Sequence, residues 1–152
     1  MKPLLLLMAP LTLGHPDDGR FAIACTGTTH TRHTMDGTEH VASGELPRQI
    51  YVIAPAANDV QRALVPRKEF EPVCSTEGGM RFVSIAPGLV TASSDQGGEP
   101  SWTCKFEVDR MTGKGSSLLR GDWANGRFHE MLWEFTCEKT EIPVFDLSRR
   151  RF

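Results

Sequence analysis

The sequence predicts an all-β protein: a single antiparallel domain of about eight short strands, arranged as a barrel or a sandwich. Three observations predict this class. Fourteen glycines and ten prolines are spread along the 152 residues and mark many turns. Several runs alternate apolar and polar residues, as half-buried strands do. The last of these runs form a continuous three-stranded meander between Trp102 and Cys137.

The N-terminal segment has the character of a short signal peptide. Lys2 provides a positive charge, and the apolar residues that follow end at the small residue Gly14. The apolar stretch is too short to cross a bilayer. We expect residues 1–14 to be a signal peptide and residues 15–152 to form one domain. The alternative is that the segment is retained as a strand packed on the core.

Short extended runs follow one another through the first two thirds of the domain. They are β-prone or alternate in polarity, and turn-forming residues separate them. The strands expected from these runs are residues 21–29, 48–54, 60–65, 69–74, 80–86 and 89–92. The run 60–65 also fits a short helix capped by Asn58 or Asp59, but its flanking prolines favour a strand. Residues 93–100 are predicted to be a loop.

Three histidines lie close together in the polar segment 30–40, at His30, His33 and His40. Imidazole is a common metal ligand, and the acidic residues of the segment, Asp36 and Glu39, could complete a site. On a strand, however, His30 and His33 would face opposite sides. We therefore expect a solvated loop and predict neither a metal site nor a cofactor.

The meander between Trp102 and Cys137 is the most regular part of the sequence. Its first strand, residues 102–109, alternates strictly. The apolar side chains that share one face of this strand are Trp102, Cys104, Phe106 and Val108. The glycines at 113 and 115 allow the chain to reverse. On the third strand, residues 127–138, the side chains of the expected core face are Met131, Trp133, Phe135 and Cys137.

An Asn-Gly dipeptide at 125–126 separates the second and third strands of the meander. This dipeptide is typical of a two-residue type I′ turn, and such a turn fixes the register of the two strands. The resulting register places Trp123 opposite Phe128 and Asp122 opposite His129. It therefore predicts an aromatic pair and an ion pair across the hairpin.

The second face of the meander carries Trp123, Phe128 and Leu132 in this register. Aromatic and apolar side chains exposed together on a sheet are typical of a binding surface. We predict that this face binds a small ligand or a protein partner. The alternative is that another sheet covers the face and makes it a second core layer.

The expected pair of Asp122 and His129 suggests a competing function, that of a small hydrolase. A histidine oriented by an aspartate can act as a general base, and the glutamates that share one face of the third strand offer a carboxylate. These glutamates are Glu130, Glu134 and Glu138. The sequence contains no G-x-S-x-G, P-loop, dinucleotide-binding or H-E-x-x-H motif. We therefore favour a non-catalytic protein.

The four cysteines, Cys25, Cys74, Cys104 and Cys137, are far apart in the sequence. Zinc sites usually draw ligands from close pairs such as C-x-x-C, which are absent here. An even number of cysteines suits two disulfides in an exported protein. Four cysteines allow three pairings, and we favour Cys25–Cys137 with Cys74–Cys104, which joins the first strand to the last. The alternative is four buried thiols.

The overall charge excludes some classes of partner. The formal net charge is −2, so no general positive field attracts nucleic acid or an acidic membrane surface. We expect no nucleic-acid partner and no transmembrane span. The sequence does not identify a partner, although an envelope protein is compatible with export.

Two motifs and a late cysteine carry a resemblance to a class of proteins. Residues 21–28 read F-x-x-x-C-T-G-T, residues 108–113 read V-D-R-x-T-G, and Cys137 follows near the end. This order resembles small exported bacterial β-proteins of unestablished activity. The resemblance implies an all-β fold in a periplasmic or secreted protein. We therefore expect a non-catalytic exported domain that binds a small ligand or a protein partner; the alternatives are the hydrolase and a structural envelope component.

Overall fold

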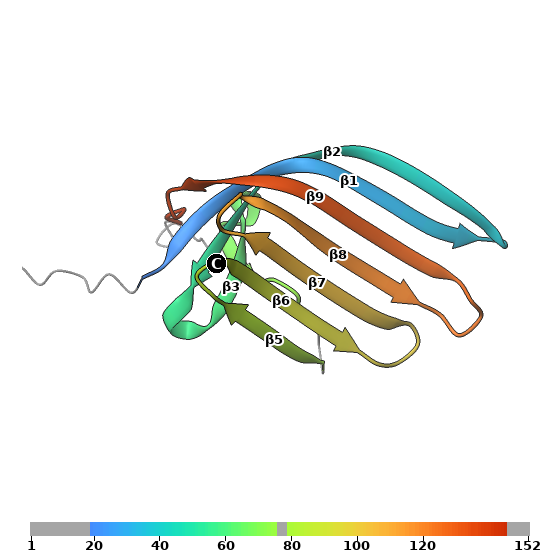
Figure 1. Ribbon diagram of the computed structural model, residues 1–152. Helices are drawn as coiled ribbons and strands as arrows, with labels where there is room; N and C mark the ends of the chain where they lie inside the picture. The colour runs from blue at the N-terminus through green and yellow to red at the C-terminus, as the bar shows by residue number, and fades with distance from the viewer. Residues whose placement is uncertain (1–18, 76–78, 146–152) are drawn as a thin grey trace, which may run out of the picture.

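The protein is a single nine-stranded antiparallel sheet that curls into a half-barrel, seen in a computed structural model that describes residues 19–75 and 79–145 (Figure 1). The strands lie in the order β4-β3-β2-β1-β9-β8-β7-β6-β5. They are β1 Phe21–Met35, β2 Thr38–Ala54, β3 Asp59–Leu64, β4 Glu69–Pro72, β5 Met80–Ile85, β6 Leu89–Gln96, β7 Ser101–Asp109, β8 Lys114–Asp122 and β9 Phe128–Thr140.

This architecture confirms the predicted all-β antiparallel class and the C-terminal meander, which is formed by β7, β8 and β9. The strand count is close to the predicted eight. The single curved sheet is a half-barrel, and the prediction had left a barrel and a sandwich open. The predicted signal peptide, residues 1–14, lies outside the described residues.

The polar segment 30–40 was expected to be a loop, and this prediction is wrong. β1 continues to Met35, and β2 begins at Thr38. Asp36 and Gly37 connect them, both with positive φ angles of 50° and 77°. A two-residue turn of this kind matches the twist of the two strands, so the hairpin extends far beyond the predicted strand end at residue 29. The predicted loop 93–100 is also shorter, since β6 reaches Gln96.

The predicted strand 60–65 is confirmed as β3, which spans Asp59–Leu64. A 3₁₀ turn lies on each side of it, Pro55–Ala57 and Val65–Arg67, with proline at the first position of one and the second position of the other. Each turn ends at a residue in the left-handed conformation, Asn58 and Lys68 respectively. The prolines fix φ at the start of each reversal, so both connections stay short.

A β-bulge in β2 bends the long hairpin. The residue Cys25 pairs with Gln49 and Gly27 with Leu46, so two steps along β1 match three steps along β2. Pro47 lies in the bulge, where a missing N–H is tolerated. The extra residue reverses the alternation, so the inner face takes Tyr51 and Gln49 on one side of the bulge and Leu46 on the other.

The inner face of the half-barrel holds the core. Its largest fully buried side chains include Phe106, Ile53, Val60 and Val90. The rings of Tyr51, Phe106 and Phe135 meet with centroids 4.8 to 6.1 Å apart. Phe106 and Val108 on β7 and Phe135 on β9 are buried, which confirms the predicted core faces of these strands.

The ring of Phe135 fits the interior because a neighbouring position is glycine. A Cβ atom at Gly115 would lie 2.5 Å from Phe135 Cε2 and 2.5 Å from the Glu107 carbonyl oxygen. Gly115 and Phe135 are directly opposite on β8 and β9. Large inner side chains therefore lie over small ones on the next strand, a common way to fill a small barrel.

The two disulfides join the favoured pairs, Cys25–Cys137 and Cys74–Cys104. Cys25 and Cys137 are directly opposite on β1 and β9. This bridge links strands that are 112 residues apart in sequence. Cys74 follows β4 and reaches across the interior to Cys104 on β7. The preferred pairing is therefore confirmed.

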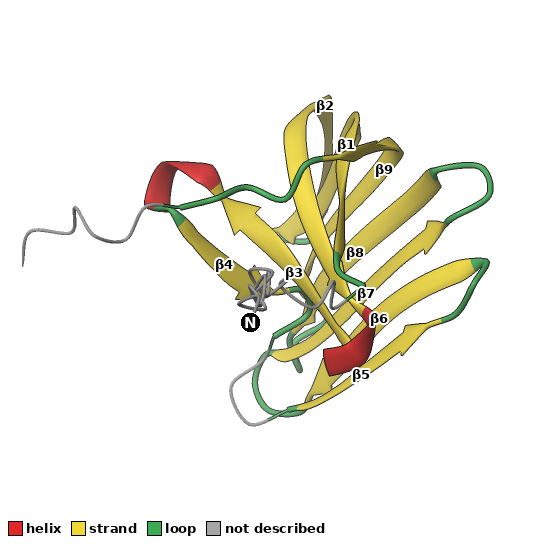
Figure 2. Ribbon diagram, turned by 90° about the vertical axis from the view of Figure 1, so that its left-hand side faces the viewer, coloured by secondary structure: helices red, strands yellow, loops and turns green. Residues whose placement is uncertain are grey.

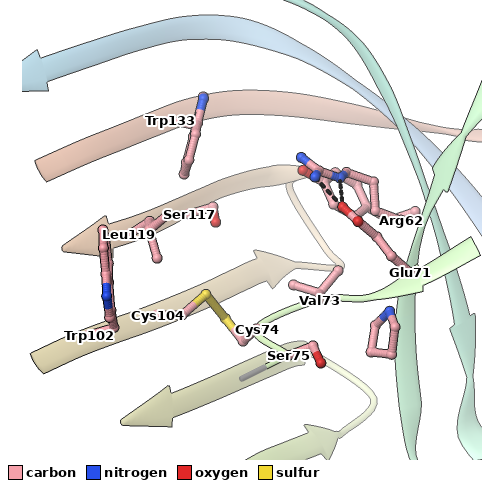
Figure 3. A pocket seen from close by; sticks show the side chains of 12 residues that line it. Arg62, Glu71, Val73, Cys74, Ser75, Trp102, Cys104, Ser117, Leu119 and Trp133 are labelled. Carbon is pink, nitrogen blue, oxygen red and sulfur yellow. Dashed lines mark hydrogen bonds and ion pairs between the residues drawn. A yellow bond between two sulfur atoms is a disulfide. The ribbon is translucent and has the colours of Figure 1, made fainter. Parts of the chain in front are cut away.

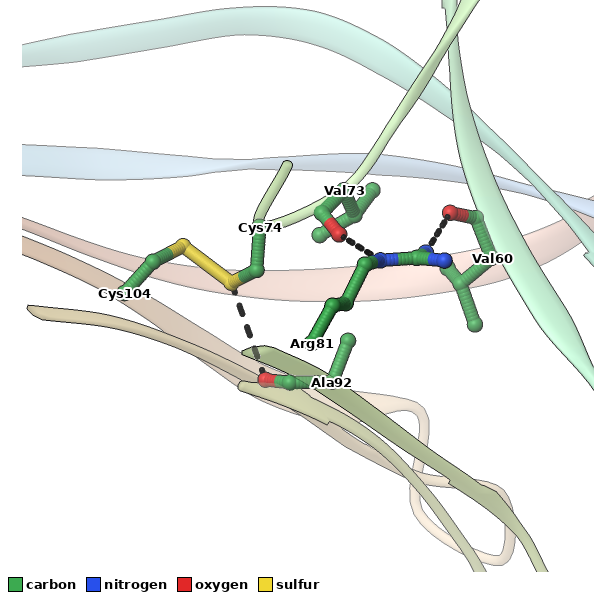
Figure 4. The surroundings of a disulfide bond; sticks show 6 residues. All are labelled: Val60, Val73, Cys74, Arg81, Ala92 and Cys104. Atoms are coloured by element: carbon green, nitrogen blue, oxygen red, sulfur yellow. Dashed lines mark hydrogen bonds between the residues drawn. A yellow bond between two sulfur atoms is a disulfide. The ribbon is translucent and has the colours of Figure 1, made fainter. Parts of the chain in front are cut away.

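The edge strand β5 is joined by side chains to β3 and to the segment that follows β4, rather than by a strand ladder (Figure 4). The guanidinium of Arg81 on β5 donates to the carbonyl oxygens of Val73 and Val60 and to the carboxylate of Asp59, each at 2.7 Å. The Cys74–Cys104 disulfide lies beside this cluster. Together they close one end of the half-barrel.

The other end of the half-barrel is not covered in this way. β3 pairs only with residues Ile50–Ala54 of β2, and β4 pairs only with β3. The long strands β1, β2 and β9 extend beyond β3 in Figure 1, and Figure 2 views the sheet from the end at which β3 lies. We call the part behind β3 and β4 the closed half. The part formed by β1 from Gly27 onward, β2 up to Leu46 and their neighbours is the open half.

Candidate functional site

A pocket of about 370 Å³ lies on the inner face where the closed half meets the open half (Figure 3). Strands β7, β8 and β9 form one wall. β3, β4 and the segment that follows β4 form the other. The side chains that carry its chemistry are Tyr51, Arg62, Glu71, Trp102, Leu119 and Trp133, and the Cys74–Cys104 disulfide lies at its base. We call this cavity the concave pocket.

Two tryptophans give the concave pocket an aromatic wall. Trp133 lies opposite Ser117, and Trp102 lies opposite Gly121, so each bulky ring has a small neighbour on β8. A Cβ atom at Gly121 would lie 2.8 to 3.0 Å from the Trp102 ring, which shows how closely this ring covers the strand. Both tryptophans are only partly buried, because no strand of the described chain covers them.

The third tryptophan of the chain belongs to the same face. Trp123 follows β8, and its ring meets Trp102 edge-on with centroids 6.0 Å apart. All three tryptophans of the sequence are therefore on the concave side of the half-barrel. A tryptophan side chain combines a large apolar ring with a polar N–H group, and such side chains are suited to binding an organic ligand.

The opposite wall of the concave pocket is polar. Arg62 on β3 and Glu71 on β4 are paired in register and form an ion pair. Tyr51, on β2, lies opposite Arg62 and is buried. Burial raises the pKa of Tyr51 to about 12; the nearby Arg62 acts in the opposite direction and Glu71 in the same direction as burial. The pocket thus combines an apolar wall with a small polar one.

The register of the β8–β9 hairpin differs from the prediction by one residue. The N–H of Gly126 donates to the Trp123 carbonyl and the N–H of Trp123 to the Arg127 carbonyl. Gly126 has a φ of 79°, so the connection is a three-residue loop with glycine in the left-handed position. The two-residue turn predicted from Asn125-Gly126 is therefore wrong.

This difference separates the residues of the predicted binding face. Phe128 lies opposite Asp122, and Leu132 lies opposite Leu118, on the outer face. Trp123 is on the inner side with Trp102. A shift of one residue moves side chains to the other face of a sheet, so an error in turn length was enough to group Trp123 wrongly with Phe128 and Leu132.

The outer-face ring of Phe128 is enclosed by charged side chains. The guanidinium carbons of Arg120 and Arg32 are 4.7 and 5.6 Å from its centroid. Both arginines pair with Glu130, at 2.9 and 3.3 Å. Hydrogen bonds to carboxylates raise the pKa of Arg120 and of Arg32. These ions are already paired with one another, which makes the cluster a cross-strand brace.

The expected pair of Asp122 and His129 is not formed. Asp122 accepts hydrogen bonds from Arg120, which hold the pKa of this carboxyl below its usual value. His129 is opposite Gly121 and its ring is beside His33, 6.0 Å between centroids. The two side chains lie on opposite faces of β8 and β9. The dyad required for the hydrolase is therefore absent.

Some site residues could not be identified as such from the sequence. Trp102 and Trp133 were correctly placed on the inner face, but they were expected to be core residues. The alternation of side chains predicts which face of the sheet a residue lies on, but not whether another part of the chain packs over that face. The sequence did contain a signal for a different pair of residues, the histidines of the β1–β2 hairpin. The Asp-Gly dipeptide at 36–37 is typical of a two-residue turn, and such a turn places His33 opposite His40, as in the structure.

In residues 19–75 and 79–145, no group of three or more His, Cys, Asp or Glu side chains is already arranged to hold a metal ion. Among the described residues, no helix is long and apolar enough to cross a bilayer. Compared with known proteins, the chain matches no family model and no curated sequence.

Proposed function

We propose that this protein is an exported, non-catalytic β-domain that binds a small, largely apolar ligand in the concave pocket. One observation carries this proposal: Trp102 and Trp133 form an aromatic wall that no other part of the described chain covers. The pocket volume of about 370 Å³ is within the range of roughly 300–1,000 Å³ that is typical of small-molecule sites.

The composition of the pocket supports an organic ligand with a polar end. Its tryptophan and leucine wall favours apolar or aromatic surface by burial. Tyr51 and the Arg62–Glu71 pair on the other wall offer hydrogen bonds that orient the ligand. Because Arg62 and Glu71 neutralise each other, a net charge on the ligand is not required.

The disulfides support export. All four cysteines of the sequence are paired, and such bonds persist in oxidising compartments such as the periplasm or the extracellular space. Intact mass of untagged protein made in a bacterial host, with alkylation under denaturing, non-reducing conditions, tests this part. Loss of residues 1–14 and no alkylation are expected. A full-length chain with four alkylated thiols contradicts export.

Ligand binding is tested with N-phenyl-1-naphthylamine, a neutral apolar probe whose fluorescence rises in apolar sites. We expect saturable binding that quenches tryptophan emission, since all three tryptophans are on the concave side. Trp133→Ala and Trp102→Ala should each weaken binding by roughly tenfold, the effect of losing a large buried contact.

The matched control is Phe82→Ala. Phe82 is an aromatic side chain on β5 that is 61% exposed and points away from the pocket. Its removal should leave the affinity unchanged. Equal loss in the control and the tryptophan variants, or no binding by the wild type, contradicts the proposed site. The latter result favours a structural envelope component.

A further inference from the structure

Three histidines form a row across the inner face of the open half. His40 on β2 is directly opposite His33 on β1, and His33 is opposite His129 on β9. The rings of His33 and His40 stack with centroids 5.2 Å apart and planes 16° apart. The row is on three neighbouring strands, away from the residues that line the concave pocket.

The ring nitrogens of this row do not stabilise the fold through polar contacts. Among the described residues, no hydrogen bond or ion pair engages His33, His40 or His129. His30 is the contrast, because it points to the outer face. Its Nδ1 is 3.0 Å from Ser43 Oγ, and its Nε2 is 3.3 Å from Glu134 Oε2. The inner imidazoles therefore keep their lone pairs available for a ligand.

We propose that His33 and His40 form a two-imidazole site for a borderline divalent transition-metal ion such as Zn²⁺. Imidazole nitrogen is a preferred ligand of these ions. Two rings bound to one Zn²⁺ through bonds of about 2.0–2.1 Å have centroids roughly 5 Å apart. The present separation already has this value, so binding requires the rings to turn about their side-chain torsions and leaves the backbone in place.

The hairpin holds the two ligands in this relation. The Asp36-Gly37 turn fixes the register, and Thr31–Ala42 and Met35–Thr38 are the neighbouring inner pairs. These side chains are small or apolar and carry no charge that competes for the ion. Water would complete the coordination on the open side, where His40 is exposed and His33 partly so.

The test titrates Zn²⁺ at neutral pH into untagged protein as the bacterial host produces it, followed by calorimetry and by NMR of the imidazole signals. We expect one ion per chain and shifts of the His33 and His40 signals without a shift of His30. His33→Gln and His40→Gln should each weaken binding about tenfold or more, since each removes one of two ligands.

His30→Gln is the matched control, because it removes a histidine from the same hairpin but from its outer face. It should leave the affinity unchanged. The proposal is overturned if both inner variants bind Zn²⁺ as tightly as the wild type, if the His30 variant loses binding equally, or if neither inner ring responds to millimolar Zn²⁺. Circular dichroism of each variant shows that the sheet is intact.

Discussion

The closed and open halves of this sheet use the same alternation of side chains with different results. In the closed half, inner side chains such as Phe106, Ile53 and Val60 are almost fully buried. In the open half, inner positions of β9, β1 and β2 carry Trp133, His33 and His40, which are partly or fully exposed. Strand pattern is therefore not what distinguishes core from site.

The difference in burial between the two halves arises because β3, β4 and the segment after β4 pack over the inner face of the closed half only. β3 pairs with only the last five residues of β2, and the segment that follows β4 reaches back to β7 through the Cys74–Cys104 disulfide. Behind β3, β4 and this segment the inner side chains are buried. Beyond them the inner face is a surface, and the aromatic side chains there are available to a ligand.

The largest effect should come from the bridge that joins β1 to β9. The double variant Cys25→Ala, Cys137→Ala removes the bridge between residues that are 112 apart in sequence. The chain-entropy model gives a loss of about 5 kcal/mol of unfolding free energy. Urea unfolding measures it. The Cys74→Ala with Cys104→Ala variant, with a separation of 30 residues, should lose less, about 3–4 kcal/mol. A reversed order would show that native contacts dominate over loop length.

Truncation of inner side chains should separate the two halves. Phe106→Ala leaves a cavity in the closed half and should cost about 3–5 kcal/mol. Met131→Ala removes an inner side chain of the open half that is only partly buried, and it should cost well under half as much. Thermal and urea unfolding of both variants provide the comparison. Equal losses would show that the open half is covered in solution.

The seam that joins β5 to β3 and to the segment after β4 should depend on Arg81. Arg81→Met keeps the aliphatic stem but removes three hydrogen bonds. The Val73 carbonyl and the Asp59 carboxylate lose the guanidinium, while the Val60 carbonyl keeps the bond from the Val73 N–H. We expect a loss of about 2–3 kcal/mol. Amide hydrogen exchange should accelerate in β3 and β5 and stay unchanged in β1 and β9. Uniform acceleration across the sheet would show that the seam is not a separate unit.

Tyr51, at the boundary of the two halves, should make stability depend on alkaline pH. Its folded pKa of about 12 is above the ordinary value of 10.0, so the neutral phenol is favoured in the fold. The corresponding stability is fully present below pH ~10 and is lost as pH rises toward 12, by about 2 kcal/mol. Tyr51 is the only tyrosine of the chain, so near-ultraviolet absorbance reports its titration directly. Tyr51→Phe should show no such loss.

Much of the fold could be predicted from the sequence because local signals carried it. Alternation in β7 and β9 gave the core face, and the flanking prolines identified β3 as a strand. The hairpin register could not be predicted as reliably. Asn125-Gly126 fits both a two-residue turn and a longer loop with glycine in the left-handed position, and the two differ by one residue.

The candidate site was predicted less well, for a different reason. Whether Trp102 and Trp133 are core or surface depends on where β3 and β4 end relative to β2, a long-range property. The histidine segment was misassigned because its polar composition resembles a loop. The strands of this segment are polar because no other part of the described chain packs on their inner face.

The position of the β1–β9 pair also constrains the order of folding. These strands are the first and last of the described chain, yet they are neighbours near the middle of the sheet. Strands β1 to β4 and strands β5 to β9 can each pair locally with the next strand along the chain. The two parts become one sheet only when β9 reaches β1 and Cys137 meets Cys25. Under the proposed export, a chain that enters an oxidising compartment from its N-terminus holds Cys25 without its native partner until almost the whole domain has arrived.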